Sequence, residues 1–429
     1  MSTTTASVAS GAWTVPAAAK WFVSALTLVL FVLAAAVSAE RKDVTHGYPG
    51  DELEHASYVA HIQHTGDAWP ALASMRLLDP QTFQFTGEAN YLNHPPMFYA
   101  LLAAIGPKLE GRPQALLVYR LLDVALAAAG LAALLALALT AGFSRQQFYA
   151  YVVPLAFIPV LVPLACGVTN DNLAFLGGAL ATLGAWQLLA TGRGSWLALA
   201  LAGVVAAGWA KLTGLLLTAA MVSGVFVYLG WRGRWRWTWT MAAVLAIALA
   251  AAPYLIYVIQ YGSLTPETPA QTALLQNAGW ADFPRKSFPD YLAYFVVAFV
   301  ANWMPTSDVR SAFQYAMLAV PVAALGCALA GVALSLRRVR HRRESPLDVV
   351  VIAGAIALAA TFAIHITFSY GRHLASGSLL DAYPRYYLPL AAIVPLAGLS
   401  LLAAINAPRC RVALFAFLVA GPMVFGIFG

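Results

Sequence analysis

The amino-acid sequence predicts an all-α polytopic membrane protein, a bundle of about 11 transmembrane helices. The chain is 61% hydrophobic, and its mean hydropathy is +0.73. Only 10% of its residues are charged, whereas a soluble domain carries about a quarter. Many apolar runs also reach the roughly 20 residues that a helix needs to cross a bilayer. A soluble core cannot absorb so many runs, so a membrane is the expected environment.

The predicted spans follow one another over most of the chain. Two shorter apolar pieces, 95–107 and 291–304, are bounded by prolines and are too short to cross, so we expect re-entrant or interfacial helices there. The first run ends in AAAVSAE, which resembles a signal-peptide cleavage site, but it is long enough to span and we expect it to be retained. The spans lie near 19–39, 114–141, 147–166, 171–190, 195–209, 212–230, 238–259, 313–336, 347–368, 386–405 and 411–428.

The basic residues predict the orientation, because cytoplasmic loops are enriched in lysine and arginine. A cytoplasmic N-terminus places 13 of the 25 lysines and arginines on inside segments, against 2 of the 18 acids, Glu344 and Asp348. The basic stretches 231–240 and 337–344 are interpreted as inside anchors with an interfacial tryptophan belt, and anionic-lipid binding is the alternative. The inside basic residues are Lys20, Arg145, Arg193, Arg232, Arg234, Arg236, Arg337, Arg338, Arg340, Arg342, Arg343, Arg409 and Arg411.

This orientation predicts a single membrane domain over 1–429 with no separate soluble domain. The Ala/Leu/Arg-rich composition points to a bacterium, and thus to its inner membrane. The long polar loops 40–112 and 260–312, with the shorter 369–385, then form a periplasmic or extracellular face, where we expect the active site. The sequence contains no Walker or dinucleotide glycine pattern. Because the net charge of +7 is explained by the inside loops, nucleic acid is not an expected partner.

The first outer loop concentrates acids and histidines in HGYPGDELEHASYVAHIQHTG, residues 46–66. After a turn at 49–50, Asp51 can start a helix, and Glu54 three residues later completes a capping-box pattern. That pattern does not explain Glu52. The functional interpretation is that an exposed carboxylate of this helix start points into a cleft as a general base.

The histidines of this loop raise the question of zinc. His61 and His64 share one helix face, His55 precedes them by one and a half turns, and His46 lies before the helix. No HExxH or equivalent ligand spacing is present. The three cysteines also lack metal spacing. We therefore expect polar interfacial histidines and no metal site, although a divalent metal remains compatible with the sequence.

Two further loop segments combine polar groups with helix starts. In NYLNHPPMFYALL the proline pair can begin a helix, and the functional interpretation places Asn93 and His94 at the mouth of the same cleft as Asp51. In CGVTNDNLAFLGG the residues Asn170 and Asp171 can cap the next helix. Alternatively, these two side chains line a polar pocket at the membrane surface.

Several cations lie on the same predicted face. Lys211 interrupts the apolar stretch GWAKLTGLLL, where the positive-inside rule does not favour it, so a functional role is the default interpretation. Arg385 opens a late span between tyrosines. Arg120 and Asp123 are spaced i, i+3 and can pair with each other. Together these cations suit an anionic lipid headgroup such as a phosphate.

These segments resemble the GT-C superfamily of membrane glycosyltransferases, in the bacterial branch that includes protein mannosyltransferases and aminoarabinose transferases. YPGDELEHASYVAHIQHTGDAWP resembles their first outer loop, with its Pro-Asp-Glu type motif. NHPPMFYALL resembles a His/Lys-Pro-Pro-Leu-Tyr segment, YRLLDVALA an Arg-Leu at the next span, VTNDNLAFLGGAL an Asn-Asp turn and GWAKLTGLLL a Thr-Lys-x-Thr-like turn. PRYYLPLAAIVPL is similar to their late Gly-Arg-Tyr-x-x-Pro segment, so the order agrees over roughly residues 20 to 405.

The resemblance implies a GT-C-like bundle and an inverting transferase that uses a polyprenyl-phosphate-linked sugar. The acceptor would be an extracytoplasmic cell-envelope glycan, lipid or protein. The resemblance implies Asp51 as the general base, with Glu52 as the fallback, and no required metal or cofactor. The residues implied to bind the donor phosphate are Lys211, Arg385, His94 and Arg120. Those implied to bind substrate are His55, Tyr58, Asn93, Asn170, Asp171 and Tyr386.

A secondary transporter or lipid flippase is the alternative function, followed by a non-catalytic membrane scaffold. The two short proline-bounded segments could be half-helices of inverted repeats, and Arg120, Asp123, Lys211 and His365 could line an ion path. Against this alternative, the ionisable groups cluster toward one face. The polar loop of about 70 residues after the first span is also long for a plain connection.

Overall fold

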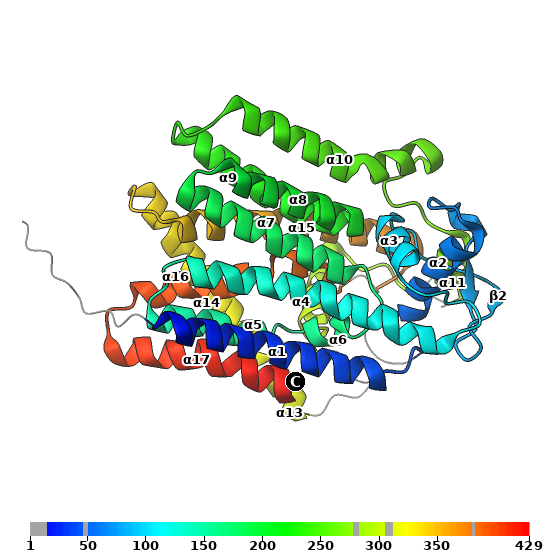
Figure 1. The fold of residues 1–429 in the computed structure, drawn as a ribbon, viewed down its shortest axis with the longest axis horizontal. Coiled ribbons are helices and arrows are strands. Elements are labelled where there is room, and N and C mark those ends of the chain that lie inside the picture. The colour runs from blue at the N-terminus through cyan, green and yellow to red at the C-terminus, as the bar shows by residue number, and fades with distance from the viewer. Residues whose placement is uncertain (1–14, 46–49, 278–282, 305–311, 380–381, 429) are drawn as a thin grey trace, which may run out of the picture.

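The computed structural model describes residues 15–45, 50–277, 283–304, 312–379 and 382–428, and within them long helices lie side by side (Figure 1). This confirms the predicted all-α class. One small sheet, which the sequence analysis did not predict, pairs β1 (Arg76–Leu78) with β2 (Phe85–Ala89) in antiparallel register. His46 and Pro49 of the first outer loop, and Pro305 after the second short apolar piece, lie outside the described residues.

The elements of the first half of the chain form the first outer loop and the centre of the bundle. They are α1 (Ala17–Arg41), α2 (Glu52–Thr65), η1 (Leu72–Ser74), β1 (Arg76–Leu78), β2 (Phe85–Ala89), α3 (Met97–Ile105), η2 (Pro113–Ala115), α4 (Leu116–Thr140), α5 (Arg145–Leu155), α6 (Leu161–Ala165), α7 (Asp171–Thr191), α8 (Gly194–Ala210) and α9 (Leu212–Trp231).

The second half completes the bundle and returns the chain to the outer loops. Its elements are α10 (Trp237–Tyr261), α11 (Pro269–Asn277), α12 (Phe288–Ala301), α13 (Ala312–Met317), α14 (Ala319–Arg340), α15 (Pro346–Ser376), η4 (Pro384–Leu390), α16 (Ile393–Ala404) and α17 (Pro408–Phe428). The two short apolar pieces predicted to be helical but too short to span are α3 and α12.

Eight helices in the described residues are long and apolar enough to cross a membrane, and a bent pair raises the number to nine. The bent pair is η4 with α16, whose axes differ by 61°. The polytopic prediction is confirmed, and within the described residues eight of the 11 predicted spans, or nine with the bent pair, pass this test of length and hydropathy. The eight are α1, the helix formed by η2 and α4, α7, α9, α10, α13 with α14, α15 and α17.

Two of the eleven predicted spans are not long helices. The run 147–166 is split into α5 and α6, because Pro154 lies at the end of α5 and Val160 has a left-handed φ of 61°. A proline in a helix removes a hydrogen-bond donor and clashes with the preceding turn. The run 195–209 is α8, which has 17 residues and is thus about 25 Å long. Apolar composition alone does not reveal that the run 147–166 is broken.

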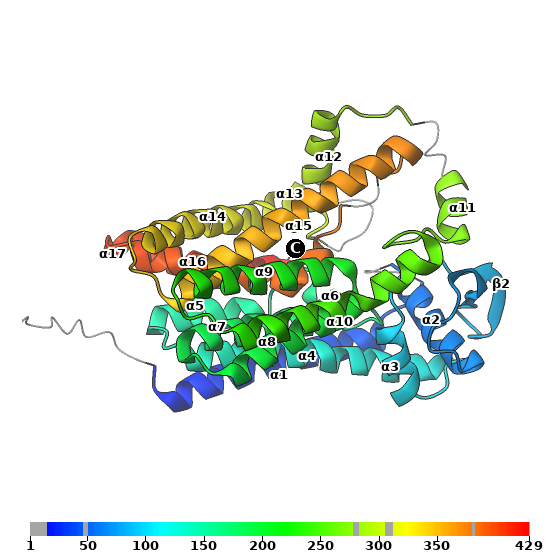
Figure 2. The same cartoon turned by 90° about the horizontal axis from the view of Figure 1, so that it is seen from above.

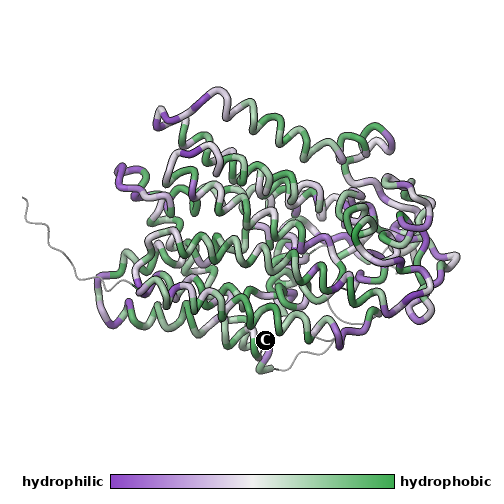
Figure 3. Tube along the Cα trace, viewed as in Figure 1, coloured by the Kyte–Doolittle hydropathy of each residue, from purple (hydrophilic) through white to green (hydrophobic). Residues whose placement is uncertain are grey.

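The polar segments gather at the two ends of the bundle (Figure 3). One end carries α2, α3, β1 and β2, and the other carries the loop between α9 and α10 (Figure 1). The apolar sides of the helices lie between these ends. This distribution is what a protein needs when its middle is in hydrocarbon and its ends are in water.

α7 is the central helix of the bundle, and 78% of its most apolar window is buried. It packs on α4, α8, α9 and η4. Close packing on α8 depends on glycine, because a Cβ at Gly177 or Gly203 would overlap the backbone of the facing helix. Small residues let helix backbones approach in membranes. The packing of α7 therefore fixes the position of its first residue, Asp171.

The predicted outer loops meet at one end of the bundle. The side chain of Asn93 donates to the carbonyl of Pro266 at 2.9 Å, and Thr268 donates to the carbonyl of Tyr91 at 3.2 Å. Figure 2 shows α11 on the side of α2 and β2, and α12 beside α15. Because Asn302 donates to the carbonyl of Ala382 at 2.8 Å, the third loop joins the same end.

Candidate active site

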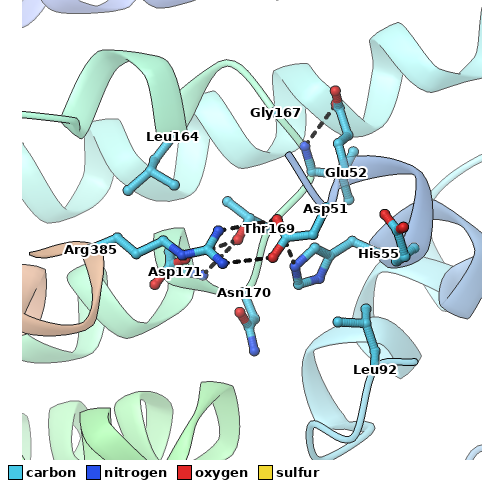
Figure 4. A network of polar contacts seen from close by, with 12 residues as sticks. Asp51, Glu52, His55, Leu92, Leu164, Gly167, Thr169, Asn170, Asp171 and Arg385 are labelled. Atoms are coloured by element: carbon cyan, nitrogen blue, oxygen red, sulfur yellow. Dashed lines mark hydrogen bonds and ion pairs between the residues drawn. The ribbon is translucent and has the colours of Figure 1, made fainter. Parts of the chain in front are cut away.

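Asp51 occupies the N-cap position of α2, but its side chain makes no capping hydrogen bond. The capping-box interpretation is therefore wrong here. The carboxylate instead accepts two hydrogen bonds from Arg385, Nη2 to Oδ2 at 2.7 Å and Nη1 to Oδ1 at 3.1 Å (Figure 4). Such a fork fixes the orientation of both groups. The two residues are 334 positions apart in the chain, so the fold brings them together.

A second ion pair, between Lys211 and Asp171, lies beside the first. Arg385 links the two pairs, because its Nε is 3.9 Å from Oδ2 of Asp171. We call Asp51, Asp171, Lys211 and Arg385 the central cluster. Each member is at most 8% exposed, and their formal charges cancel. Removal of one member would leave a buried charge without its partner, which is costly.

A one-residue break between two helices positions Lys211. Its backbone is extended, with φ −162° and ψ 157°, so α8 ends and α9 begins on either side of it. Asn170 supports the break, because its Nδ2 donates to the carbonyl of Ala210 at 2.7 Å. Although Asn170 holds the N-cap position of α7, its side chain does not cap that helix. The predicted substrate residue Tyr386 places its ring 4.9 Å from the Lys211 ammonium.

The environment of Asp51 favours its charged form. Burial alone would raise the pKa of the Asp51 carboxyl, but the charge of Arg385 and the interaction with His55 outweigh it and hold that pKa well below its usual range. An acid with a low pKa is a weak base. Asp51 is therefore poorly suited to take a proton for as long as Arg385 stays in contact with it.

His55 connects Asp51 to an aromatic wall. Its Nε2 lies 3.7 Å from Oδ1 of Asp51, and its Nδ1 is 2.9 Å from the hydroxyl of Tyr99. The His55 ring also stacks on His94 with centroids 6.0 Å apart. Burial, followed by the charges of Lys211 and His55, lowers the pKa of His94 well below its usual value. His94 is thus neutral, and it can approach a phosphate as a hydrogen-bond donor rather than as a cation.

Tyr58 and Asn93 hold the loops of this wall in place. The Tyr58 ring stacks on Tyr99 with centroids 4.0 Å apart, and its hydroxyl donates to the carbonyl of His94 at 3.3 Å. Tyr257 donates to the same carbonyl at 2.8 Å. Asn93 binds the second outer loop through Pro266. Within the described residues these two predicted substrate ligands contact other protein groups.

Glu52 belongs to a separate cluster. Its two oxygens accept from Arg120, Nε to Oε1 at 2.8 Å and Nη2 to Oε2 at 2.9 Å, and Lys42 lies 3.5 Å away. Oε1 also accepts from the backbone of Val168 at 3.0 Å. Figure 4 shows Glu52 pointing away from Arg385. We call Lys42, Glu52 and Arg120 the Glu52 cluster.

The proposed pairing of Arg120 with Asp123 is not formed. Arg120 donates to Glu52 and to the carbonyls of Ala39 and Lys42 at 2.9 and 2.8 Å. Asp123 accepts from the backbone of Thr169 at 3.1 Å. Arg120 therefore ties α4 to the end of α1 and to α2, instead of facing Lys211.

Glu54 is a candidate that the sequence analysis assigned to capping. Its carboxyl is half-buried, and burial, together with the nearby charge of Asp51, raises its pKa to about 7. A carboxylate with a pKa near neutrality is a suitable general base. The signal in the sequence was the i, i+3 spacing of Asp51 and Glu54, which places both on one helix face. Tyr99 was also missed, because a tyrosine in an apolar helix is usually part of a core.

A metal centre has no obvious ligands here. Among the described residues there is no group of three or more histidine, cysteine, aspartate or glutamate side chains that could hold a metal ion. His61 packs edge-on against Phe85 with centroids 6.2 Å apart, and His64 pairs with Glu110 at 3.0 Å. These histidines lie among the loops beside α2.

No model of a known protein family matches the chain, and no curated protein matches it. Two solved structures are similar to it, both of ArnT from Cupriavidus metallidurans. The structure in the apo state is 15% identical with a TM-score of 0.48, over 93% of this chain and 62% of ArnT. The structure bound to undecaprenyl phosphate is 15% identical with a TM-score of 0.45, over 94% of this chain and 69% of ArnT. This chain thus spans about 62% of the length of the ArnT chain in the apo structure.

Proposed function

We propose that this chain is an inverting membrane glycosyltransferase of the GT-C type, which moves a sugar from a polyprenyl-phosphate donor to an extracytoplasmic acceptor. The central cluster is the observation that supports this most, because a carboxylate and two cations are buried together at one end of the bundle. Transfer from a phosphate-linked sugar needs cations at the phosphate and a base near the acceptor. The sequence segments that resemble GT-C enzymes include all four cluster residues.

Arg385 and Lys211 are the proposed ligands of the donor phosphate. Each is now paired with a carboxylate, Asp51 or Asp171. A phosphate presents oxygens at the spacing of a guanidinium fork and carries at least as much charge as a carboxylate. It therefore competes with Asp51 for Arg385. His94 and Tyr386 lie beside these cations and would contact the same phosphate or the first sugar.

Donor binding would then activate the base. The pKa of Asp51 is low because Arg385 neutralises its charge. When Arg385 turns to the phosphate, that stabilisation of the anion is lost and the pKa of Asp51 rises. The carboxylate becomes a stronger base only when a donor is present. This order would keep Asp51 inactive as a base until the donor has bound.

The reaction is a single displacement at the anomeric carbon. The hydroxyl or amine of a cell-envelope glycan, lipid or protein attacks on the face opposite the phosphate, and its proton passes to Asp51. The bond from the anomeric carbon to the phosphate oxygen breaks, and its electron pair leaves with the polyprenyl phosphate. The configuration inverts because one displacement occurs. Lys211 and Arg385 stabilise the charge that develops on the leaving phosphate.

The remaining predicted residues act around this centre. Glu52 holds Arg120, so we propose that both position the start of α2 rather than meet substrate. His55 orients Asp51, and Asn170 with Asp171 holds Lys211. The active-site end would face the periplasm or cell exterior of a bacterial inner membrane, with the N-terminus in the cytoplasm. No divalent metal is required, because two cations already face the phosphate.

A reconstituted assay tests this function. Purified protein in liposomes would receive a panel of polyprenyl-phosphate sugars with extracted membrane glycans, and release of polyprenyl phosphate would be followed. We expect release with one donor class, and a loss of about 10²–10⁴-fold in Asp51→Asn, the range that base catalysis contributes. Glu88→Gln is the matched control, because it removes an exposed carboxylate from the same loop.

A measurement of polyprenyl phosphate binding distinguishes a role of Asp51 as the base from a role in donor binding. Asp51→Asn should bind polyprenyl phosphate at least as tightly as the wild type, because the amide competes less well for Arg385. Near-wild-type turnover of Asp51→Asn would remove Asp51 as the base, and a selective loss in Glu54→Gln would assign that role to Glu54. Absence of release from any donor by well-folded protein that still binds polyprenyl phosphate would contradict the transferase reaction.

A further inference from the structure

The end of the bundle opposite to the central cluster contains a cavity of about 300 Å³. It lies where α7 ends and where the loop joins α9 to α10, and it is lined by Gly192, Gly233, Arg234, Trp235, Arg236 and Trp239. α7 has 21 residues, so this cavity is roughly 30 Å from Asp171 along that helix. The proposed transferase site therefore makes no use of it.

A second cavity, of about 420 Å³, adjoins the first and is apolar. It runs between α9 and α10, and its lining includes Val222, Phe226, Val227, Val244 and Ile247. Val227 and Val244 are 73% and 59% exposed on these membrane-spanning helices, so the groove opens toward the hydrocarbon. Trp235 lines both cavities, so they lie next to each other.

The arginines of the first cavity carry charge that their surroundings do not balance. Arg232 nearby is paired with Glu344 and lies outside the lining. Arg234 gives one hydrogen bond, from Nη2 to the carbonyl of Leu189 at 3.4 Å, and Arg236 lies 5.1 Å over the ring of Trp239. Within the described residues no carboxylate lines this cavity. Two guanidinium groups thus face a space with no acid.

We propose that the two cavities form one binding site for an anionic phospholipid. The headgroup phosphate would lie between Arg234 and Arg236, whose planar forks suit phosphate oxygens. One acyl chain would follow the apolar groove along α9 and α10. Trp235 and Trp239 would lie at the boundary, where indole rings with an apolar body and a polar N–H are favoured. The polar segment between the two helices is therefore a ligand site as well as a topological anchor.

Lipid binding tests the proposal directly. The full-length protein would be placed in nanodiscs of phosphatidylcholine with graded phosphatidylglycerol, and retained lipid would be counted by native mass spectrometry. We expect one phosphatidylglycerol to be retained preferentially. Arg234→Gln and Arg236→Gln should each lower that preference about fivefold. This is the change in affinity that corresponds to the free energy one basic residue contributes near an anionic membrane surface. Arg409→Gln is the control, because it removes an exposed basic residue from the start of α17.

Two further measurements distinguish a lipid site from a simple anion site. Gly230 lines the apolar groove, and a Cβ added there meets nothing within 4 Å, so Gly230→Leu is chosen to place an apolar side chain at the groove. It should weaken retention of phosphatidylglycerol, while inorganic phosphate and glycerol phosphate should bind weakly or not at all. If the free anions bind as tightly as the lipid and Gly230→Leu has no effect, the lipid proposal is overturned. Equal lipid retention by Arg234→Gln, Arg236→Gln and Arg409→Gln would overturn it as well.

Discussion

Asp51 and Glu52 are adjacent in the chain, yet their carboxylates bind different arginines. Asp51 is the N-cap residue and has a non-helical backbone, whereas Glu52 is the first residue of α2. Asp51 reaches Arg385 while Glu52 turns to Arg120. The first pair lies beside Lys211 in the central cluster. The second joins α2 to α4 and to the end of α1. Substitutions of Asp51 and of Glu52 should therefore be measured in two different assays.

Glu52→Gln should act on stability. It removes the charge that compensates buried Arg120 and Lys42, and loss of one partner from a buried pair costs about 3–5 kcal/mol. We expect a drop of this size in the free energy of unfolding, measured by denaturant titration in detergent. Exposed Glu40 at the end of α1 provides the control Glu40→Gln, for which we expect a change within about 0.5 kcal/mol. Unchanged stability in Glu52→Gln would contradict the structural role.

Glu54 should make stability depend on pH. Its pKa is raised from 4.5 to about 7 in the folded state, so the folded protein holds this proton more tightly than the unfolded chain. The resulting stabilisation is complete below pH 4.5 and is lost as the pH rises toward 7. Glu54→Gln, which resembles the protonated form, should flatten the change of unfolding midpoint with pH across this window. Glu88→Gln, which changes an exposed glutamate, serves as the control. If the unfolding midpoint changes with pH equally in Glu54→Gln and wild type, the raised pKa of Glu54 is refuted.

The sequence identified the members of the site better than their partners. Asp51, Asp171, Lys211 and Arg385 could each be recognised as polar groups beside apolar runs. Their pairing could not, because contacts across hundreds of residues depend on how the helices pack. Glu54 shows the complementary error, since local spacing favoured a capping role that the tertiary contact of Asp51 overrides.

The elements explain where the cluster can form. Long apolar runs such as α4, α7 and α10 were predictable, because length and hydropathy suffice to define a span. The break at Lys211 was also predicted, because the expected spans 195–209 and 212–230 lie on either side of it. The break at Val160 was not, since the run 147–166 was expected to be one span. The break at Lys211 matters most, because it turns one apolar stretch into two helices with a cation between them.

Gly178 controls how closely η4 approaches α7. A Cβ at this position would overlap the backbone of Pro389, and backbone cannot move aside as a flexible side chain would. Gly178→Ala should therefore shift η4 and with it Arg385. Since misplacement by about 1 Å can cost 10²-fold in rate, we expect a loss near that size in the release assay. Gly326→Ala in α14, where an added Cβ meets nothing within 4 Å, should keep full activity, and equal activity of both variants would contradict this role.

The whole molecule concentrates its proposed chemistry at one end. Asp51 precedes α2, Asp171 begins α7, Lys211 precedes α9, and Arg385 lies in the first turn of η4. A secondary transporter holds its substrate near the middle of the bilayer, between repeats. A cluster built from helix ends at the outer loops instead suits a site that receives one substrate from the membrane and another from water.

Accessibility across the membrane tests this organisation. After the three free cysteines, Cys166, Cys327 and Cys410, are replaced by serine, Glu88→Cys in β2 and His341→Cys after α14 introduce single labels. The two positions lie at opposite ends of the bundle, as the places of β2 and of the end of α14 show (Figure 1). A membrane-impermeant maleimide added to spheroplasts should label Glu88→Cys and should reach His341→Cys only after lysis. The reverse pattern would place the central cluster in the cytoplasm and would sink the proposed use of an extracytoplasmic acceptor.

The positions of the helix starts carry an electrostatic consequence beyond the side chains. α2, α7 and α9 begin at the central cluster and α8 ends there. Each helix N-terminus carries a partial charge of roughly +0.5 and each C-terminus roughly −0.5, so three positive ends outweigh one negative end. The side-chain charges of the cluster cancel, so these backbone dipoles leave the site electropositive. An anion released there is still attracted after the chemistry is complete. We therefore expect spent polyprenyl phosphate to leave slowly and to inhibit its own formation, so that its removal sets the pace of turnover.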